Sequence, residues 1–202
     1  MLHLDNEIFK AKKIVCVGRN YSEHIQELQN EVPENLVVFM KPSSCIGEEL
    51  YSKHLKQSVH YEGEICFLVQ DGDFKGVGFG LDLTKRELQS YLKQKSLPWE
   101  RAKCFDGAAV FSDFISFDGD IDKLSLRFYK DEVLIQEGNV TQMIYKPDVM
   151  FQEITSFARL EDYDIVMSGT PKGVGIVEKG SRYKGEILYE ENILLQKEWT
   201  AK

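Results

Sequence analysis

Residues 60–69 read HYEGEICFLV, and we expect this stretch to decide the fold. Its β-branched and aromatic residues predict a strand, and side chains alternate between the two faces of a strand. The alternation would place Glu62 and Glu64 beside His60 on one face. Two carboxylates therefore project side by side from one expected strand.

The next apolar stretch, VGFGLDL at 77–83, predicts a second strand that is interrupted by glycines. It leads into TKRE, where Thr84 would cap a helix and Glu87 would reach back to complete a capping box. The helix should then turn three side chains inward, namely Leu88, Tyr91 and Leu92.

Two further strands are expected towards the N-terminus. KIVCV at 13–17 is a short β-branched run, and Asn20 with Glu23 resembles a helix N-cap with its reciprocal partner. LVVFM at 36–40 is of the buried type and stops where proline follows Lys41. Lys41 should therefore lie at the end of a strand.

The remainder predicts an α+β, β-rich fold. Beyond Phe114 the pattern consists of short strands and turns, with one helical stretch near 147–158. The 202 residues contain no repeat and no Pro/Gly/Ser-rich linker, so a single domain over 1–202 is expected.

Composition excludes several classes of protein. Hydrophobic residues make up 43% of the chain, enough for a sizeable core, and the formal net charge of −8 disfavours a nucleic-acid partner. Neither a membrane span nor a secretion signal is evident. The four cysteines are scattered without C-x-x-C pairs, which favours the reducing cytoplasm and argues against a zinc site.

The acidic residues suggest a metal site. Two carboxylates as close as Glu62 and Glu64 repel unless a proton or cation lies between them, although a solvated strand face is the simpler alternative. Asp82 lies where an expected strand meets an expected helix, and the simpler alternative is that it merely interacts favourably with the helix dipole or caps the helix. Because Thr84 already provides the expected cap, Asp82 is free to bind a metal ion. Three carboxylates suit Mg²⁺ or Mn²⁺, with Ca²⁺ as a further option, better than zinc or copper.

Other side chains have chemical potential. His24 and Glu27 share a helix face at i and i+3, so the carboxylate could orient the imidazole as a base, although such pairs are often surface features. Lys41 and Lys103 could neutralise substrate charge, or their charged heads could simply be solvated. The turn SGTPKGVG at 168–175 fails the phosphate-loop pattern, yet its amides could hold a carboxylate.

Several motifs together resemble the fumarylacetoacetate hydrolase superfamily, and most closely its single-domain acylpyruvate hydrolase members. The resemblance runs from about Lys13 to the final strands. The motifs that carry it are VGRNYSEHIQE (17–27), VVFMKPSS (37–44), VHYEGEICFLV (59–69), GLDLTKRELQ (80–89), LPWERAKCFDGAAVFS (97–112), QEGNVTQMIY (136–145) and VMSGTPKGVG (166–175).

The resemblance implies a mixed β-sandwich roll, a homodimer and a small keto-acid substrate. It implies that Glu62, Glu64 and Asp82 hold the metal ion, with His24, Glu27 and Lys103 in catalytic roles. It further implies a set of substrate-binding residues, namely Arg19, Lys41, Arg86, Gln89 and Thr170.

Two turns depart from the family pattern. The usual Pro-Gly is replaced by Asp162-Tyr163, and the usual Asn-Gly hairpin by Lys130-Asp131. Because losing glycine removes easy access to positive φ, we expect these turns to adopt other geometries. The chain also lacks the N-terminal domain of fumarylacetoacetase proper, so a substrate smaller than fumarylacetoacetate is expected.

The leading hypothesis is metal-dependent hydrolysis of a 3-acylpyruvate such as acetylpyruvate or fumarylpyruvate, releasing pyruvate and a carboxylic acid. Decarboxylation of oxaloacetate is the alternative that needs no attacking water. Isomerisation of a 2-hydroxyhepta-2,4-diene-1,7-dioate type of substrate is a third. A non-catalytic domain in which the metal only staples loops for partner binding is the non-enzyme alternative.

Overall fold

A mixed seven-stranded sheet forms the centre of the computed structural model, which describes residues 1–27 and 33–202. All its pairings are antiparallel except that of β14 with β3. The strand order is β10 (Ala109–Phe111), β9 (Asp73–Asp82), β8 (Gly63–Gln70), β14 (Ile165–Met167), β3 (Lys13–Gly18) and β4 (Val37–Pro42), with β11 (Ile115–Ser116) also paired to β9.

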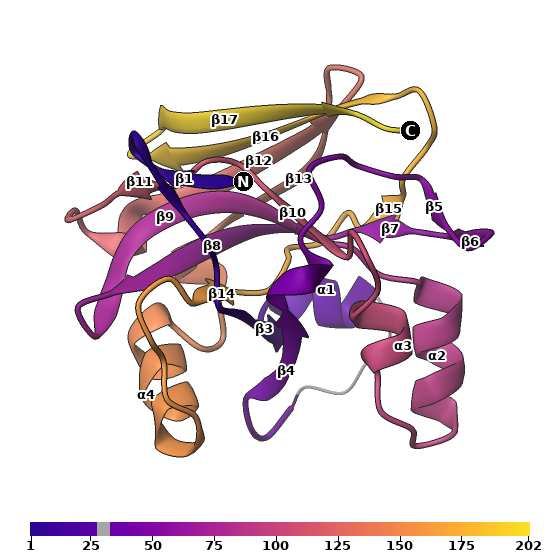
Figure 1. Ribbon diagram of the computed structural model, residues 1–202, viewed down its shortest axis with the longest axis horizontal. Coiled ribbons are helices and arrows are strands. Elements are labelled where there is room, and N and C mark those ends of the chain that lie inside the picture. The colour runs from indigo at the N-terminus through magenta and orange to yellow at the C-terminus, as the bar shows by residue number, and fades with distance from the viewer. Residues whose placement is uncertain (28–32) are drawn as a thin grey trace.

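An antiparallel four-stranded sheet packs against one face of the central sheet (Figure 1). Its order is β13 (Val133–Asn139), β12 (Leu124–Lys130), β16 (Arg182–Tyr189) and β17 (Asn192–Thr200). Phe79 of the central sheet stacks on Phe128 with ring centroids 5.4 Å apart. Gly185 makes room for this ring, because a Cβ there would lie 2.3 Å from Phe79.

The opposite face of the central sheet is covered by the N-terminal hairpin of β1 (Leu2–Leu4) and β2 (Glu7–Phe9). The ring of Phe9 meets that of Phe114 edge-on at 5.8 Å. Both faces of the central sheet are thus buried, which explains why β8 is an almost continuous apolar run.

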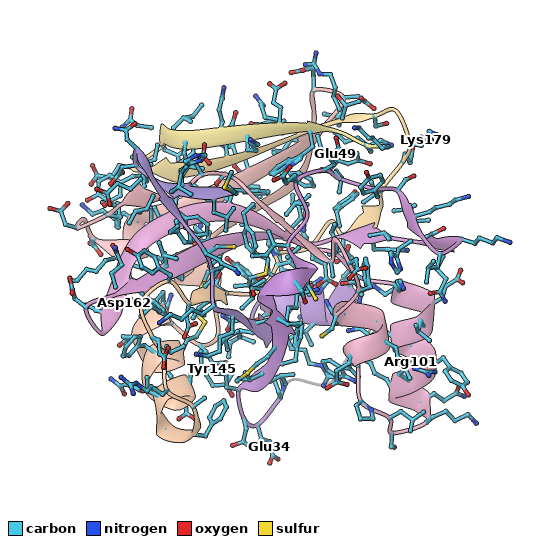
Figure 2. The ribbon with its side chains drawn as sticks, viewed as in Figure 1. Glu34, Glu49, Arg101, Tyr145, Asp162 and Lys179 are labelled. Atoms are coloured by element: carbon cyan, nitrogen blue, oxygen red, sulfur yellow. The ribbon has the colours of Figure 1, made fainter. Side chains whose placement is uncertain are left out.

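Helix α4 (Pro147–Phe157) and the pair α2 (Arg86–Gln94) and α3 (Glu100–Lys103) lie at opposite lower corners of Figure 1, with α1 (Ser22–Glu27) between them. None of the helices in the described part of the chain is long and apolar enough to cross a membrane. Charged side chains such as Arg101 and Asp162 lie on the outside (Figure 2). The remaining elements are η1 (Ser43–Cys45), η2 (Ile121–Lys123), η3 (Val140–Gln142), the pair β5 (Lys53–His54) and β6 (Gln57–Ser58), and the pair β7 (His60–Tyr61) and β15 (Gly175–Ile176).

The β-rich sandwich expected from the sequence is confirmed, including the helix at 147–158. The strand expected over 60–69 is instead broken at Glu62 into β7 and β8. The break arises because β7 pairs with β15, while β8 pairs with β9 and β14. Glu62 lies at the junction, where its backbone carbonyl accepts a hydrogen bond from the Asp82 amide at 2.9 Å.

Both predicted capping boxes are wrong, because the capping side chains have distant partners. Asn20 bonds to the backbone of Tyr145 and Ser168 instead of capping α1. The hydroxyl of Thr84 accepts a hydrogen bond from Lys103 Nζ at 2.6 Å and donates to the nearby Asp82 carbonyl, and α2 begins only at Arg86 without a side-chain cap. A buried polar group must be satisfied wherever a partner lies, and sequence does not reveal distant partners.

The inward face of α2 was also only partly predicted. Leu92 is buried and Leu88 is half-buried, but Tyr91 is 53% exposed. Gln89 is buried in its place. The helix is therefore rotated towards a polar surface, which the functional site supplies.

The expectation that the two glycine-free turns change geometry is wrong. The β12–β13 hairpin turns at Asp131 and Glu132 with φ of 47° and 66°, and Tyr163 has φ of 71°. Asp131 accepts a hydrogen bond from the Arg182 amide at 2.8 Å, and the Tyr163 ring stacks on Phe9 at 5.4 Å. These contacts hold backbone conformations that glycine would adopt at lower cost.

Substituting Glu132→Gly is expected to stabilise the protein by about 1 kcal/mol, since a left-handed residue with a Cβ is strained by roughly that amount. The exposed ion pair of Glu132 with Arg182 that is lost contributes little. Urea denaturation would measure the gain. Glu132→Ala loses the same ion pair but keeps the Cβ, so an equal gain in that variant would contradict the strain account.

Candidate metal centre

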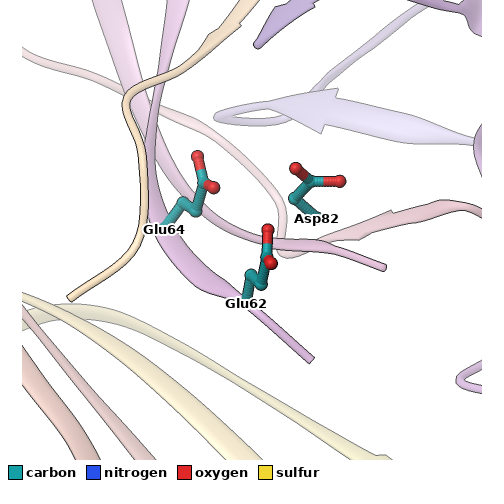
Figure 3. Close-up of side chains that lie close together, drawn as sticks. All are labelled: Glu62, Glu64 and Asp82. Atoms are coloured by element: carbon teal, nitrogen blue, oxygen red, sulfur yellow. The ribbon is translucent and has the colours of Figure 1, made fainter. Parts of the chain in front are cut away.

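Three buried carboxylates converge at the junction of β7, β8 and β9 (Figure 3). Each of Glu62, Glu64 and Asp82 offers an oxygen, and these oxygens all lie within 4.8 Å of one another. The antiparallel register sets Glu64 opposite Gly80, two residues before Asp82. The structure therefore brings together the three residues that the sequence suggested as metal ligands.

Two cations lie against one side of this carboxylate trio. Lys103 Nζ contacts Glu62 Oε2 at 2.8 Å and Asp82 Oδ2 at 2.7 Å, and Arg86 pairs with the other oxygen of Glu62. Burial alone would raise the pKa of Glu62, but the charges of Lys103 and Arg86 outweigh it and hold that pKa well below its ordinary value. Glu62 is thus ionised and held in place.

Glu64 has the opposite environment. Burial, and then the charges of Asp82 and Glu62, raise its pKa well above the ordinary value. Its Oε2 accepts a hydrogen bond from the Gly169 amide at 2.7 Å, but among residues 1–27 and 33–202 no cation pairs with it. Glu64 is therefore the carboxylate of the trio whose charge a bound cation would offset directly, since Glu62 and Asp82 already have ion-pair partners.

The donor set fits a hard divalent ion. Asp82 Oδ1 is buried and lies 2.9 Å from Lys41 Nζ, while Asp82 Oδ2 contacts Lys103. Carboxylate oxygens are the preferred ligands of Mg²⁺, Mn²⁺ and Ca²⁺. The convergence of three carboxylates, one of which has no ion-pair partner among the described residues, therefore points to a cation between the three side chains.

Lys41 lies beneath this site and does not line the cavity. Its side chain is fully buried, and its ammonium group reaches Asp82 and three backbone carbonyls, those of Leu83, Lys103 and Ala108. This placement does not favour the direct substrate contact that the resemblance implied. It favours a role in which Lys41 positions Asp82.

Replacing Lys41 by methionine is expected to destabilise the metal-free protein by about 3 kcal/mol or more, because a buried carboxylate and several carbonyls lose their partner. The midpoint of urea denaturation measures this loss. Lys12→Met is a control, since Lys12 forms only an exposed pair with Glu161. Equal stability of the two variants would show that Lys41 is not a structural ion-pair partner.

A small cavity of about 40 Å³ opens above the carboxylates and is lined by all three of them. His24 also lines it, and its Nδ1 lies 3.0 Å from Glu27 Oε2. The second oxygen of Glu27 accepts a hydrogen bond from the Gly173 amide at 3.0 Å. The pair predicted from i and i+3 spacing is therefore formed, and Nε2 is the nitrogen left for chemistry in the cavity.

Four of the five predicted substrate-binding residues line the same cavity, namely Arg19, Arg86, Gln89 and Thr170. Gln89 accepts a hydrogen bond from Arg86 at 2.8 Å. The Thr170 hydroxyl donates to the Gly63 carbonyl at 2.9 Å and fixes the glycine-rich turn against β8. The sequence thus located most of the lining, whereas contact with substrate stays a prediction.

Sequence reasoning missed several residues of the site. Gln136 accepts from the Gly63 amide at 2.9 Å and donates to Thr170 at 2.8 Å, so it joins the second sheet to the carboxylate strand. Three more line the cavity, namely Phe39, Lys93 and Trp99. Gln136, Phe39 and Trp99 lie within the sequence motifs quoted above, whereas Lys93 lies in none of them. The motifs were the available signal for these three residues, but a motif alone does not assign a role to a side chain.

Residues 13–196 match the family described as fumarylacetoacetate (FAA) hydrolase C-terminal. The chain is 37% identical over 191 residues to an oxaloacetate decarboxylase, mitochondrial, of Dictyostelium discoideum, covering 86% of this chain and 88% of the relative. It is 33% identical to an oxaloacetate tautomerase of Escherichia coli (strain K12), covering 85% and 86%.

A solved structure has a closely similar fold. The fumarylpyruvate hydrolase of Pseudomonas aeruginosa, in complex with Mn²⁺ and pyruvate, superposes with a TM-score of 0.90 at 25% identity, covering 99% of this chain and 94% of that one. The relatives thus include both oxaloacetate enzymes and a hydrolase of a diketo acid.

Proposed function

Since the chain belongs to the fumarylacetoacetate hydrolase family, we propose that it is a divalent-metal-dependent enzyme that enolises oxaloacetate, interconverting its keto and enol forms. The observation that carries this proposal is the trio of buried carboxylates beside His24 in one cavity. The relatives that match over most of the chain at 33–37% identity are named for oxaloacetate, which supports the substrate. The acylpyruvate hypothesis therefore takes second place.

Glu62, Glu64 and Asp82 would hold the ion, with Mg²⁺ or Mn²⁺ preferred and Ca²⁺ as a further option. When bound, such an ion supplies Lewis-acid stabilisation of an enolate oxygen. The fumarylpyruvate hydrolase with Mn²⁺ and pyruvate supports this choice of ion and ligand class. Lys103 adds a fixed positive charge beside two of the three carboxylates.

His24 is the residue that we assign to proton transfer. In the keto form, Nε2 would accept a proton from C3 of the substrate, and the electron pair of that C–H bond would move to the C2 oxygen as an enolate. Protonation of this oxygen completes the enol, and the reverse steps restore the ketone. Glu27 would hold the imidazole in the required tautomer through Nδ1.

The same electrostatic arrangement can support decarboxylation. If the bond between C3 and the distal carboxylate breaks, its electron pair forms the enolate of pyruvate, and protonation at C3 follows the departure of carbon dioxide. This step needs no attacking water. The named activity of the Dictyostelium relative makes decarboxylation the companion reaction to test.

Hydrolysis of a 3-acylpyruvate is the second candidate, because the His24–Glu27 pair could also activate water. Water would add to the distal carbonyl, and the C–C bond would then break to give a carboxylic acid and the pyruvate enolate. The fumarylpyruvate hydrolase structure supports this option. An isomerase or a metal-stapled binding domain would release no pyruvate from either substrate.

We propose a homodimer as the family-like assembly. The cytoplasm stays the proposed compartment on the basis of the four free cysteines, although the Dictyostelium relative is named as mitochondrial. Both proposals can be checked directly, by light scattering of the purified protein and by cell fractionation.

The proposed function is tested with metal-stripped protein, to which Mg²⁺ or Mn²⁺ is returned. The decay of enol-oxaloacetate absorbance would report tautomerisation, and pyruvate coupled to lactate dehydrogenase would report decarboxylation or acetylpyruvate cleavage. The same metal concentration without protein is the essential blank. Metal-dependent enol decay above that blank supports the tautomerase, whereas pyruvate from acetylpyruvate alone would move the assignment to the hydrolase.

A further inference from the structure

Lys93 is a cation that the proposed chemistry does not use. It projects from α2 into the cavity that the carboxylates line. Two other cations that line this cavity already have ion-pair partners. Lys103 contacts Glu62 and Asp82, and Arg86 contacts Glu62. Lys93, in contrast, has no carboxylate within 4.0 Å among residues 1–27 and 33–202.

An aromatic wall fixes the position of Lys93. Its ammonium group lies 4.8 Å from the centroid of the Trp99 ring, and Trp99 meets Phe39 edge-on at 5.9 Å. Lys103 lies over the Phe39 ring at 5.0 Å. Lys93 and Lys103 therefore contact different rings of one aromatic wall, Trp99 and Phe39, and of the two only Lys103 is ion-paired with the carboxylate trio.

This environment is unfavourable for an isolated positive charge. Burial, together with the charges of Arg19, Arg86 and Lys103, lowers the pKa of Lys93 to about 8, against the smaller opposing effect of Glu62. A half-buried cation without a counter-ion in a substrate cavity is a candidate for binding an anionic ligand group. The cation–π contact with Trp99 orients the ammonium without neutralising it.

The geometry points to Lys93 as the residue that binds the second carboxylate of a dicarboxylic 2-oxo acid, an inference that rests on the proposed function. The metal ion held by the carboxylate trio would bind the 2-oxo acid group, which mono- and dicarboxylic substrates share. Lys93 would then distinguish the two classes, because only a dicarboxylic acid offers an anion at the other end. It is a specificity-determining residue and takes no part in proton transfer.

The direct test compares two ligands that differ only in the second carboxylate. Malate and lactate of matched configuration share a 2-hydroxy acid head, and neither requires turnover. Their dissociation constants would be measured with saturating Mn²⁺ on wild-type protein and on Lys93→Met. Methionine keeps the length and the packing on Trp99 but removes the charge.

We expect the wild type to bind malate about tenfold or more tightly than lactate, as one hydrogen bond to a charged group allows. In Lys93→Met this preference should fall to near unity, while lactate binding stays unchanged. Lys93→Arg should restore part of the preference. Lys95→Met, at the exposed C-cap that follows α2, is the matched control and should behave like the wild type.

The preference should also depend on pH. Because the lysine must be protonated to hold an anion, the preference for malate should decline as the pH rises through about 8. The other charged groups that face Lys93 are Arg19, Arg86, Lys103 and Glu62, and none of them is altered in Lys93→Met. The variant should therefore show no such decline between pH 7 and 9.

Each contrary outcome has a distinct meaning. A malate preference that survives in Lys93→Met, or is missing from the wild type, would overturn the role of Lys93 and leave the proposed function standing. If neither ligand bound to any of the proteins, the proposed function would itself be contradicted, and the inference about Lys93 would fall with it.

Discussion

Replacing Glu64 by glutamine is expected to lower metal-dependent turnover about 100-fold or more, and at the same time to raise the unfolding temperature of the metal-free protein. The two effects have one cause. In the absence of a cation, Glu64 is a buried carboxylate beside Glu62 and Asp82 with no ion-pair partner among the described residues. In the proposed function this charge helps to hold the ion, so losing an anionic ligand would weaken binding of the metal that stabilises charge in the substrate.

The pH dependence follows with a definite sign. The pKa of Glu64 is raised in the folded protein, so its protonated form contributes stability that is present below the ordinary value of 4.5. This contribution is lost as the pH rises through the raised pKa. The free energy of unfolding of the metal-free wild type should therefore fall as the pH rises from about 4.5 through the raised pKa of Glu64. The fall should be smaller in Glu64→Gln.

Thermal unfolding with and without Mn²⁺ measures these effects. Wild type should gain stability from the ion, whereas Glu64→Gln should gain little. Glu186→Gln is a useful control, because Glu186 is also buried but pairs with Lys184 on β16, away from the cavity. An unaltered response of Glu64→Gln to Mn²⁺ would remove Glu64 from the ligand set.

Substituting His24→Ala is expected to lower the rate of oxaloacetate tautomerisation by about 10²–10⁴-fold, which is the usual contribution of a positioned general base. The metal should still bind, because His24 is not a member of the carboxylate trio. The Mn²⁺ affinity of His24→Ala should therefore match that of wild type within about a factor of three, well below the ~10-fold change that 1.4 kcal/mol represents.

The substrate range of His24→Ala separates the chemical roles. Decarboxylation of oxaloacetate needs no attacking water, whereas acylpyruvate cleavage does. Loss of acetylpyruvate cleavage with decarboxylation retained would support water activation by the His24–Glu27 pair. Equal loss of every activity, together with weaker Mn²⁺ binding, would instead indicate that His24 only shapes the cavity.

Local patterns predicted much of the fold because the strands are short and strongly apolar. The run at 13–17 and the helix at 147–158 required nothing beyond periodicity and one proline. The break at Glu62 was not predictable, because it depends on β7 pairing with β15, more than a hundred residues away. The same limit explains the capping errors, since Asn20 and Thr84 bond to partners outside their own helices.

In the candidate site, too, some features follow from local sequence patterns and others depend on contacts between distant residues. Glu62 and Glu64 were suggested by alternation alone, whereas Asp82 joins them through the antiparallel register of β8 and β9. The burial of Lys41 under Asp82 is a consequence of packing, so the sequence could equally suggest a substrate contact. Lys93 gave no signal at all, because its significance depends on the neighbouring Trp99 and on the absence of a paired carboxylate in the described chain.

The most direct test of the central claim is to titrate Mn²⁺ into metal-stripped protein while following the decay of enol-oxaloacetate above the blank with Mn²⁺ alone. The account predicts no excess rate without metal and a saturable rise with it, and Glu64→Gln should stay near the blank at the same concentrations. A full rate in the stripped protein, or an undiminished rise in Glu64→Gln, would contradict the claim that the three buried carboxylates hold the ion that drives the reaction.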